Sequence, residues 1–304
     1  MQPQRRWWRA LPDGKRISAL GFGCSSLWAK PHFADEGAAR ILDTLWAEEV
    51  NHFDTGPSYG EGLGERRLGA WLEGKPRDDK VIATKVGTNL IDGAIVRSFA
   101  PEALEASFRG SLERLGLERV DILYLHGPAI EDLDPAVFAL FDRLKREGRI
   151  GLSGVNSFDN PVLEATAATP IDAVMLQYNA GDFRNRAALE KLAAAGKIVM
   201  SGTALGRAQF DLSRFVPSNR DRAWYLARML RHDPLFVLKG LRVRRRLLAT
   251  GKPPAEAAIQ FAAGHPLIVS NLFGTSSAEH ARANARAGHG FLDNEQWTRL
   301  ATCA

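Results

Sequence analysis

The chain is poor in cysteine and has no long hydrophobic run. Its 304 residues contain two cysteines, Cys24 and Cys303, whose separation indicates neither a disulfide framework nor a metal site. Such cysteine use is typical of a reducing environment, so we predict a cytoplasmic protein. No apolar stretch approaches the roughly 18 residues that span a bilayer. The N-terminal residues Arg5 to Trp8 have no apolar segment behind them, so neither a secretory signal nor membrane association is expected.

Positive charge is concentrated in one segment. The whole chain carries +5, whereas Arg207 to Lys252 alone has twelve Lys or Arg and three Asp, a local net charge of +9. One interpretation is a solvated, arginine-rich surface. The other is an anion site for a cofactor pyrophosphate, a phosphorylated substrate or an acidic carrier. Nucleic acid is a weaker alternative, because no recognition motif accompanies the charge, and we predict no nucleic-acid partner.

Strand-like and helix-like patterns alternate along the chain. The predicted strands cover residues 17–22, 50–53, 81–84, 120–125, 150–155, 173–178, 198–201 and 267–273. This alternation predicts a parallel sheet with right-handed crossovers, closed as a (β/α)8 TIM barrel. We expect residues 1–304 to form one barrel domain, with the basic residues 207–252 inserted after the seventh strand.

Two further signals refine this architecture. Asp13-Gly14 lies between two short runs and predicts an N-terminal β-hairpin that closes the bottom of the barrel. A doubly wound open sheet is the rival fold. No glycine-rich GxGxxG fingerprint follows the first strand, which argues against the dinucleotide-binding version of that rival.

The stretch from Asn51 to Gly60 carries the strongest candidates for chemistry. An apolar run leads to Asp54, and Tyr59 follows five residues later in a segment broken by glycine and proline. The next two predicted strands end at Lys85 and near His126. Each residue alone also fits a structural role. Because the carboxyl ends of parallel barrel strands form one face, however, the four side chains are expected to converge there.

Four separated segments together resemble the aldo-keto reductase superfamily. They are FDTGPSYGEGLGERRLG from Phe53 to Gly69, the strand ending at Lys85, LYLHGP around His126, and GLSGVNS from Gly151 to Ser157. GLGERRLG followed by PRDDKVIATKVG looks most like NAD-linked aldose dehydrogenases of the L-fucose, D-threo-aldose and L-galactose type. The resemblance runs from about Ile17 to Asn284. It implies a (β/α)8 barrel and an enzyme that transfers hydride between a nicotinamide cofactor and an aldehyde, ketone or sugar hemiacetal.

The resemblance implies a role for each of the four residues. Tyr59 would be the general acid and base, and Lys85 would lower its pKa, since a nearby ammonium favours phenolate. Asp54 would hold Lys85, and His126 would hydrogen-bond the substrate oxygen. Two alternatives stay open on the same barrel: a nucleotide-binding regulatory subunit, and an isomerase or lyase that retains its cofactor.

The resemblance also assigns cofactor contacts to the loops at the strand ends. The chain reads GVNS where many members read GVSN before the carboxamide site. The run that ends at Gly206 lacks the tyrosine that stacks on the nicotinamide in many members, so either another ring stacks or that face is open. The predicted cofactor contacts are Gly23, Cys24, Ser25, Asp54, Asn156, Ser157, Gln177, Thr203, Leu205, Gly206, Gly274, Thr275, Ser276, His280 and Asn284. No metal site is visible.

The adenosine end bears on the choice between NAD and NADP. NADP-specific members commonly place a cation at the start of this stretch and an arginine four residues before the final Asn284. Here those positions are Gly274 and His280. A 2′-phosphate requires fixed cations, and histidine is mostly neutral near pH 7. The sequence therefore predicts NAD or NADP, with NAD favoured, and leaves Arg282 or the basic segment as other sources of charge.

The expected substrate is a small carbonyl compound or sugar, with an anionic compound as one alternative. Its pocket is predicted between the loops over residues 87–99 and 127–134 and the basic segment. Trp28, Phe33, Trp224 and Tyr225 are candidates for its walls, and each also fits plain packing.

Overall fold

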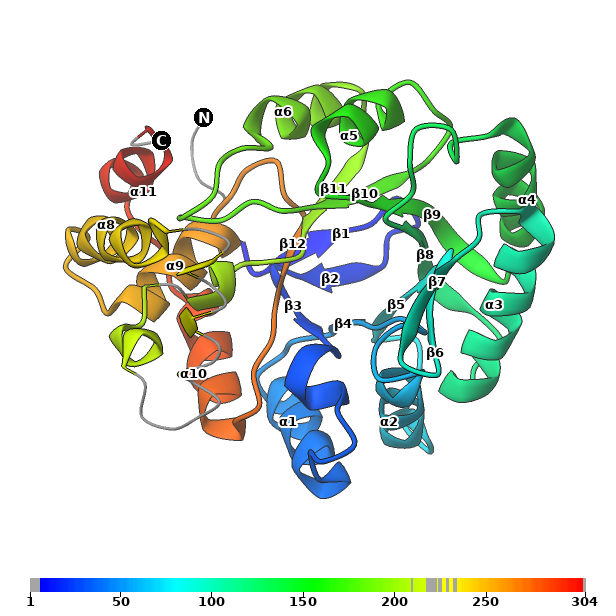
Figure 1. Cartoon of the computed structure of the whole chain (residues 1–304), viewed down its shortest axis with the longest axis horizontal. Coiled ribbons are helices and arrows are strands. Elements are labelled where there is room, and N and C mark those ends of the chain that lie inside the picture. Colours follow the sequence, from blue (N-terminus) through cyan, green and yellow to red (C-terminus); the bar gives the residue numbers. More distant parts are fainter. Residues whose placement is uncertain are drawn as a thin grey trace.

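A closed barrel of parallel strands forms the centre of the molecule (Figure 1). The computed structural model describes residues 6–208, 210–216, 223, 226–227, 230–231 and 234–302. Pairing between the last barrel strand and the first closes the barrel, so the predicted (β/α)8 fold is confirmed. The barrel strands are β3 (Leu20–Gly23), β4 (His52–Asp54), β5 (Val81–Val86), β8 (Val120–His126), β9 (Ile150–Asn156), β10 (Ala173–Leu176), β11 (Ile198–Ser201) and β12 (Ser270–Phe273).

Helices surround the strands in Figure 1. The prediction missed α5, whose seven residues are too few for a clear helical period, although Val162 and Leu163 bury one side of it. The α-helices are α1 (Asp35–Ala47), α2 (Leu63–Leu72), α3 (Pro101–Leu115), α4 (Pro135–Arg146), α5 (Asn160–Thr166), α6 (Arg186–Ala194), α8 (Phe236–Leu248), α9 (Pro254–Ala263), α10 (Ala278–His289) and α11 (Asn294–Thr302).

The N-terminal hairpin covers one end of the barrel. Strands β1 (Trp8–Ala10) and β2 (Arg16–Ser18) pair antiparallel around the predicted Asp-Gly turn. Arg9 donates to the carbonyl oxygen of Val269 at 2.9 Å, just before β12. The first barrel strand therefore begins at Leu20 rather than at Ile17, because residues 16–18 pair within the hairpin instead.

A second hairpin replaces the loop predicted over residues 87–99. Strands β6 (Thr88–Ile91) and β7 (Ala94–Arg97) pair antiparallel. Their two-residue turn is Asp92-Gly93, with φ angles of 49° and 75°. Two positive φ angles are typical of a type I′ turn, whose twist matches that of a hairpin. The same Asp-Gly signal that predicts the first hairpin was thus present here as well.

Side chains fill the inside of the barrel. Tyr124 is fully buried and donates its hydroxyl to the sulfur of Met200 at 3.0 Å. A Cβ at Gly154 would lie 2.3 Å from the Tyr124 ring, so only glycine lets β9 approach β8 at this position. The interior is therefore a packed core rather than a pore.

The basic segment after β11 is described in part. It contains η2 (Gly206–Ala208), η3 (Leu212–Phe215) and α8, where the apolar spacing of residues 235–248 in the sequence predicts a helix. The residue pattern also predicts a helix over residues 224–231, but that stretch lies largely outside the described residues, as do Trp224 and Tyr225. None of the helices in the described ranges combines the length and apolar character needed to span a membrane. Those ranges also contain no cluster of three or more His, Cys, Asp or Glu suited to a metal.

Candidate active site

The loop after β4 places Tyr59 above the barrel. The amide of Tyr59 donates to the carbonyl oxygen of Gly56 at 3.0 Å, which turns the chain back toward α2. Gly60 has a φ of 62°, and a Cβ there would lie 2.0 Å from the carbonyl oxygen of Ala29. Only glycine fits this position, so the glycine of the motif fixes the path of the loop that carries Tyr59.

Four predicted residues meet at the carboxyl ends of three adjacent strands. Strand β5 pairs with β4 on one side and with β8 on the other. Lys85 donates its ammonium to Asp54 Oδ1 and, at 2.7 Å, to the carbonyl oxygen of Thr55. Its Nζ lies 4.8 Å from the centre of the Tyr59 ring. The rings of Tyr59 and His126 meet edge to face, with centroids 5.8 Å apart.

Lys85 and Asp54 form a buried ion pair. Burial lowers the pKa of Lys85, but the charges of Asp54 and Tyr59 outweigh it, and the net pKa is raised. Burial raises the pKa of Asp54 against the opposing pull of Lys85. Asp54 Oδ2 and Thr55 Oγ1 are buried with no hydrogen-bond partner among the described residues. The ion pair thus keeps Lys85 charged, while the second carboxylate oxygen of Asp54 accepts no hydrogen bond from the described residues.

Burial also determines the state of Tyr59. It raises the pKa of this phenol more than the Lys85 ammonium lowers it, and Asp54 adds to the rise. The predicted effect of Lys85, a lowering of the Tyr59 pKa, is present, but burial outweighs it and the net pKa is raised. A sequence shows the charged neighbour but not the loss of water around the hydroxyl. At neutral pH Tyr59 is a protonated phenol, which is the form that can donate a proton.

His126 is neutral at the same site. Burial lowers its pKa to about 3, and the charges of Lys85 and Arg97 act in the same direction. Ser58 Oγ lies 3.5 Å from His126 Nδ1, and Thr88 donates its hydroxyl to the His126 carbonyl oxygen at 2.6 Å. Ser58, Thr88 and Arg97 were not predicted at the site, since only the folded loops bring them near His126. A neutral imidazole retains one N–H donor.

Glycines line the mouth where β3 and β12 end side by side. A Cβ at Gly274 would meet only the Gly23 carbonyl oxygen, at 3.8 Å, and a Cβ at Gly23 would meet Ser25 Oγ at 3.7 Å. This open cradle fits the close approach of a flat ligand. Cys24 has a fully buried side chain, and burial raises the pKa of its thiol well above the usual range. Any ligand contact by Cys24 must therefore use its backbone.

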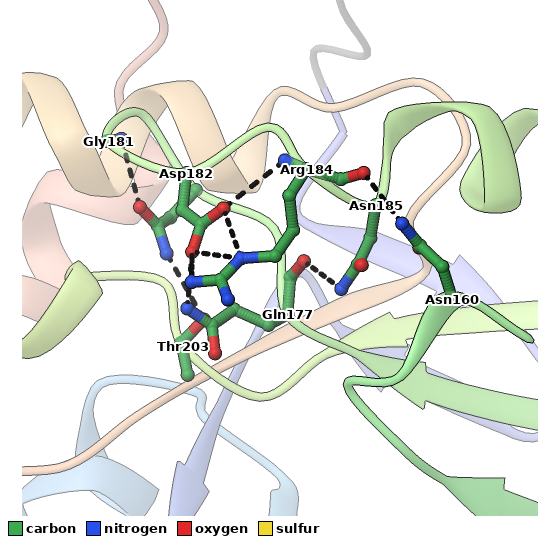
Figure 2. Close-up of polar contacts among 8 residues, drawn as sticks. Asn160, Gln177, Gly181, Asp182, Arg184, Asn185 and Thr203 are labelled. Carbon is green, nitrogen blue, oxygen red and sulfur yellow. Dashed lines mark hydrogen bonds and ion pairs between the residues drawn. The ribbon is translucent and has the colours of Figure 1, made fainter. Parts of the chain in front are cut away.

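The predicted carboxamide site is already hydrogen-bonded within the protein. The carbonyl oxygen of Met175 accepts two hydrogen bonds. One comes from the side-chain amide of Asn156 at 3.4 Å, and the other comes from the backbone amide of Ser157 at 3.1 Å. Gln177 donates its side-chain amide to Asp182 at 2.6 Å, as Figure 2 shows. These bonds fix the side chains of Asn156 and Gln177 and the backbone of Ser157 at the ends of β9 and β10.

The same network continues into the loop after β11 (Figure 2). Thr203 accepts a hydrogen bond from the side-chain amide of Asn179 at 3.2 Å. A Cβ at Gly206 would lie 2.7 Å from Asn179 Oδ1, so this glycine is also needed for packing. Leu205 is half-buried against the core. Thr203 and Gly206 thus pack beside Asn179, close to the hydrogen-bonded pair of Gln177 and Asp182.

An aromatic ring stands where the chain has no tyrosine. A Cβ at Gly202, directly after β11, would lie 3.6 Å from Cζ of Phe158. Phe158 follows β9 and is 46% exposed. Of the two alternatives left open by the sequence, another ring or an open face, the geometry favours another ring. The sequence analysis missed Phe158 because it lies two strands away from Gly202.

Of the predicted pocket walls, Trp28 is a core residue. It is 2% exposed, packs edge to face on Phe22 and donates its indole N–H to the Ala38 carbonyl oxygen at 3.3 Å. Phe33 is half-buried and packs on the core near Gly37. Both therefore take the packing role that was the alternative to a pocket wall.

With this geometry in view, comparison with known proteins assigns the chain. The model of the Aldo/keto reductase family matches residues 19–304. The chain belongs to this family. The resemblance inferred from the motifs is thereby confirmed.

Individual members of the aldo/keto reductase family match over most of their length. D-threo-aldose 1-dehydrogenase from a Pseudomonas species is 28% identical, covering 96% of this chain and 95% of the relative. L-galactose dehydrogenase from Arabidopsis thaliana is 29% identical, covering 92% and 87%. The holo form of aldo-keto reductase AKR11C1 from Bacillus halodurans has a TM-score of 0.78 at 25% identity, covering 98% and 96%. Membership identifies the chain as an oxidoreductase enzyme, and the regulatory and isomerase alternatives are not favoured.

The adenosine end predicted for an aldo/keto reductase lies before α10. The loop from Gly274 to Ser276 leads to Ser277, which caps the helix by accepting the amide of His280 at 3.2 Å. The free amides of such a helix start suit a phosphate. Arg282 points elsewhere: its Nε lies 3.5 Å from Glu48 Oε1. Asn284 lies on the buried side of α10.

Proposed function

We propose that this aldo/keto reductase reduces a small aldehyde, ketone or sugar hemiacetal, or oxidises the corresponding alcohol, with Tyr59 as the proton-transfer residue. The observation that supports this is the buried Lys85–Asp54 pair directly beneath Tyr59, beside a neutral His126. The arrangement places a proton donor, a fixed charge and a neutral hydrogen-bond donor at one point of the barrel mouth. A carbonyl oxygen that gains negative charge needs all three.

Each residue has a separate task in this proposal. The nicotinamide cofactor supplies the hydride. His126 donates its N–H to the substrate oxygen and orients it. Tyr59 then gives its proton to that oxygen, and Lys85, whose Nζ lies 4.8 Å from the ring centre, stabilises the phenolate that remains. Asp54 holds Lys85 in its charged form. A positioned acid of this kind typically raises the reaction rate by about 10²- to 10⁴-fold.

We further propose which residues hold the cofactor. The open glycines Gly23 and Gly274 and the ring of Phe158 would face the nicotinamide side, together with the oriented amides of Asn156 and Gln177. Ser25, Ser157, Thr203, Leu205 and Gly206 belong to the same loops. The loop of Thr275 and Ser276, the start of α10 with His280, and the buried Asn284 would hold the adenosine end.

NAD is the proposed cofactor in preference to NADP. The stretch from Gly274 to Ala281 contains no lysine or arginine. Arg282, the nearest candidate, pairs with Glu48, which also binds Arg286 at 2.9 Å. A 2′-phosphate would therefore lack a fixed cation in the described part of this site.

The basic segment supports packing better than substrate binding. Arg244 donates to the carbonyl oxygen of Phe210 at 3.3 Å, and Arg246 donates to that of Leu300 at 2.6 Å. These contacts attach α8 to its neighbours. An anionic substrate would need a different cation. We also propose that residues 1–304 act as one barrel domain and that its free, buried Cys24 reflects a reducing cytoplasm.

Titrating the purified protein with NADH and with NADPH, followed by tryptophan fluorescence, tests the proposal. Tighter binding of NADH, and NADH-linked or NAD-linked turnover on a panel of aldehydes, L-fucose and L-galactose, is the expected result. Much tighter binding of NADPH would show that another cation replaces Arg282. Binding of neither cofactor would contradict the proposed function.

A further inference from the structure

The β6–β7 hairpin has two different faces. Asn89 accepts a hydrogen bond from Ser107 on α3 at 3.1 Å, so one face packs against that helix. Thr88 donates to the carbonyl oxygen of His126, so the opposite face turns toward the site. Side chains alternate along a strand and cross-strand partners share a face. Thr88 pairs with Arg97, and Arg97 therefore lies on the face of the site.

Arg97 is exposed at this position. Among the described residues it has no ion-pair partner, although the chain elsewhere pairs many of its arginines. Its charge reaches His126 strongly enough to act on the imidazole. The charges of Lys85 and Arg97 both lower the pKa of His126, and of these two cations Lys85 is ion-paired with Asp54. One uncompensated positive charge therefore remains beside the proposed reaction centre.

An apolar side chain accompanies this charge. Ile95 lies two residues before Arg97, hence on the same face, and is 58% exposed. Its cross-strand partner Leu90 shares that face. A cation next to exposed aliphatic surface suits a molecule with a short carbon skeleton and an acidic end.

We propose that Arg97 binds an anionic group of the substrate, a carboxylate or a phosphate, while His126 and Tyr59 engage its carbonyl oxygen. The enzyme would then prefer acidic aldehydes, ketones or acidic sugars to their neutral analogues. Arginine suits this task because its planar fork binds both anions through paired hydrogen bonds. The inference rests on the proposed function, since it names the substrate class of the same site.

Kinetics on matched substrates test the role of Arg97. The pairs are succinate semialdehyde with butanal, and glyceraldehyde 3-phosphate with glyceraldehyde. For Arg97→Met we expect KM to rise at least about tenfold for the acidic members, with little change in kcat or in either neutral member. Arg97→Lys should recover part of the loss. Arg109→Met is the matched control, because Arg109 is exposed on α3 and should have no effect.

The two acidic substrates separate the two anions, because the larger rise in KM identifies the group that Arg97 binds. Equal effects of Arg97→Met on acidic and neutral members, or no effect, would overturn the proposal. Absence of all turnover in the wild type would count against the proposed function instead. Calorimetric titration with succinate and with phosphate, with and without NADH, then decides on Arg97. Binding that is lost in Arg97→Met supports the site, whereas equal binding to both proteins, or none to the wild type, contradicts it.

Discussion

The two ends of the barrel each bury a carboxylate, and they treat it in opposite ways. Asp121, near the start of β8, accepts from Lys15 at 2.7 Å, from Arg77 at 2.6 Å and from one backbone amide. Burial raises the pKa of Asp121, but these donors outweigh it and hold that pKa below its usual value. Asp54, at the end of β4, accepts from Lys85 as its one side-chain partner among the described residues, and there burial prevails and the pKa is raised.

The difference separates a structural end from a reactive end. Around Asp121 two cations and one backbone amide donate to a single carboxylate, which stabilises its ionised form and the fold. Around Asp54, one carboxylate oxygen and the hydroxyl of Thr55 have no partner among the described residues. Unmet hydrogen-bonding capacity costs stability. At Asp54 it falls on the carboxylate itself, at the strand ends where the family's chemistry is expected. Mutations at the two ends should therefore separate into losses of activity and losses of stability.

The largest expected effect is on activity, at Lys85. Lys85→Met removes the charge beneath Tyr59, so we expect kcat to fall by at least about 100-fold, with the residual activity moved to higher pH. Steady-state kinetics across pH will measure both changes. The double variant Lys85→Met/Asp54→Asn leaves no unpaired buried charge and should be folded but inactive. The matched change at the other end of the barrel, Lys15→Met, should leave kcat unchanged. A fall in kcat similar to that of Lys85→Met would contradict the division into a structural and a reactive end.

The next effect is on stability, at Asp121. Asp121→Ala leaves Lys15 and Arg77 without their shared partner, and removing one member of a buried pair typically costs about 3–5 kcal/mol. Both cations retain some contact with water, so we expect a loss of about 2–3 kcal/mol. Urea unfolding will measure it. The kcat of the folded fraction should be unchanged. A lower kcat per folded molecule would instead place Asp121 at the reactive end of the barrel.

A smaller effect concerns three buried histidines. His52, His126 and His265 each have a pKa lowered by burial to about 3. A depressed histidine pKa means that the unfolded chain binds the proton more tightly. Stability is therefore complete above the unfolded pKa of about 6.5 and is lost as pH falls through the window from about 6.5 to 3.

Each of these histidines should contribute on the order of 1 kcal/mol per pH unit within that window. In His265→Gln, the difference in unfolding free energy between pH 7.5 and 5.5 should shrink by on the order of 1 kcal/mol relative to the wild type. Urea unfolding at both pH values checks this. An unchanged difference would show that His265 does not remain neutral in the folded protein.

The smallest expected effect concerns Glu48, which follows α1 at the end that leads into β4 and holds Arg282 and Arg286 there. Glu48→Ala would release Arg282 toward the start of α10. We expect the affinity for NADPH relative to NADH to rise in this variant by about tenfold or less. Fluorescence titration with both cofactors will measure the ratio. A ratio identical to that of the wild type would remove Arg282 as a latent phosphate ligand.

The sequence predicted the barrel because each strand is a short apolar run with its own turn signals. It missed α5, whose seven residues show too little periodicity, and it placed a loop where Asp92-Gly93 makes a hairpin. At the site it brought Asp54, Tyr59, Lys85 and His126 to one place, since strand order alone determines that.

What the sequence could not supply was burial and contact across loops. The net direction of the Tyr59 pKa depends on lost water, and the full burial of Cys24 depends on packing. Phe158 beside Gly202 and Arg97 near His126 are neighbours only after folding. Burial and contacts between distant residues depend on tertiary structure, which the sequence around a single position does not reveal.

The most direct test of the account compares two tyrosines on the same barrel. Tyr59→Phe removes the proposed proton donor, whereas Tyr124→Phe removes a hydroxyl that donates to Met200 in the barrel interior. The measurement is kcat for NADH-linked carbonyl reduction, with NADH affinity determined alongside. We predict that Tyr59→Phe binds NADH normally and loses at least about 100-fold in kcat, while Tyr124→Phe remains active. A Tyr59→Phe enzyme with kcat close to that of the wild type would contradict the central claim that Tyr59 transfers the proton.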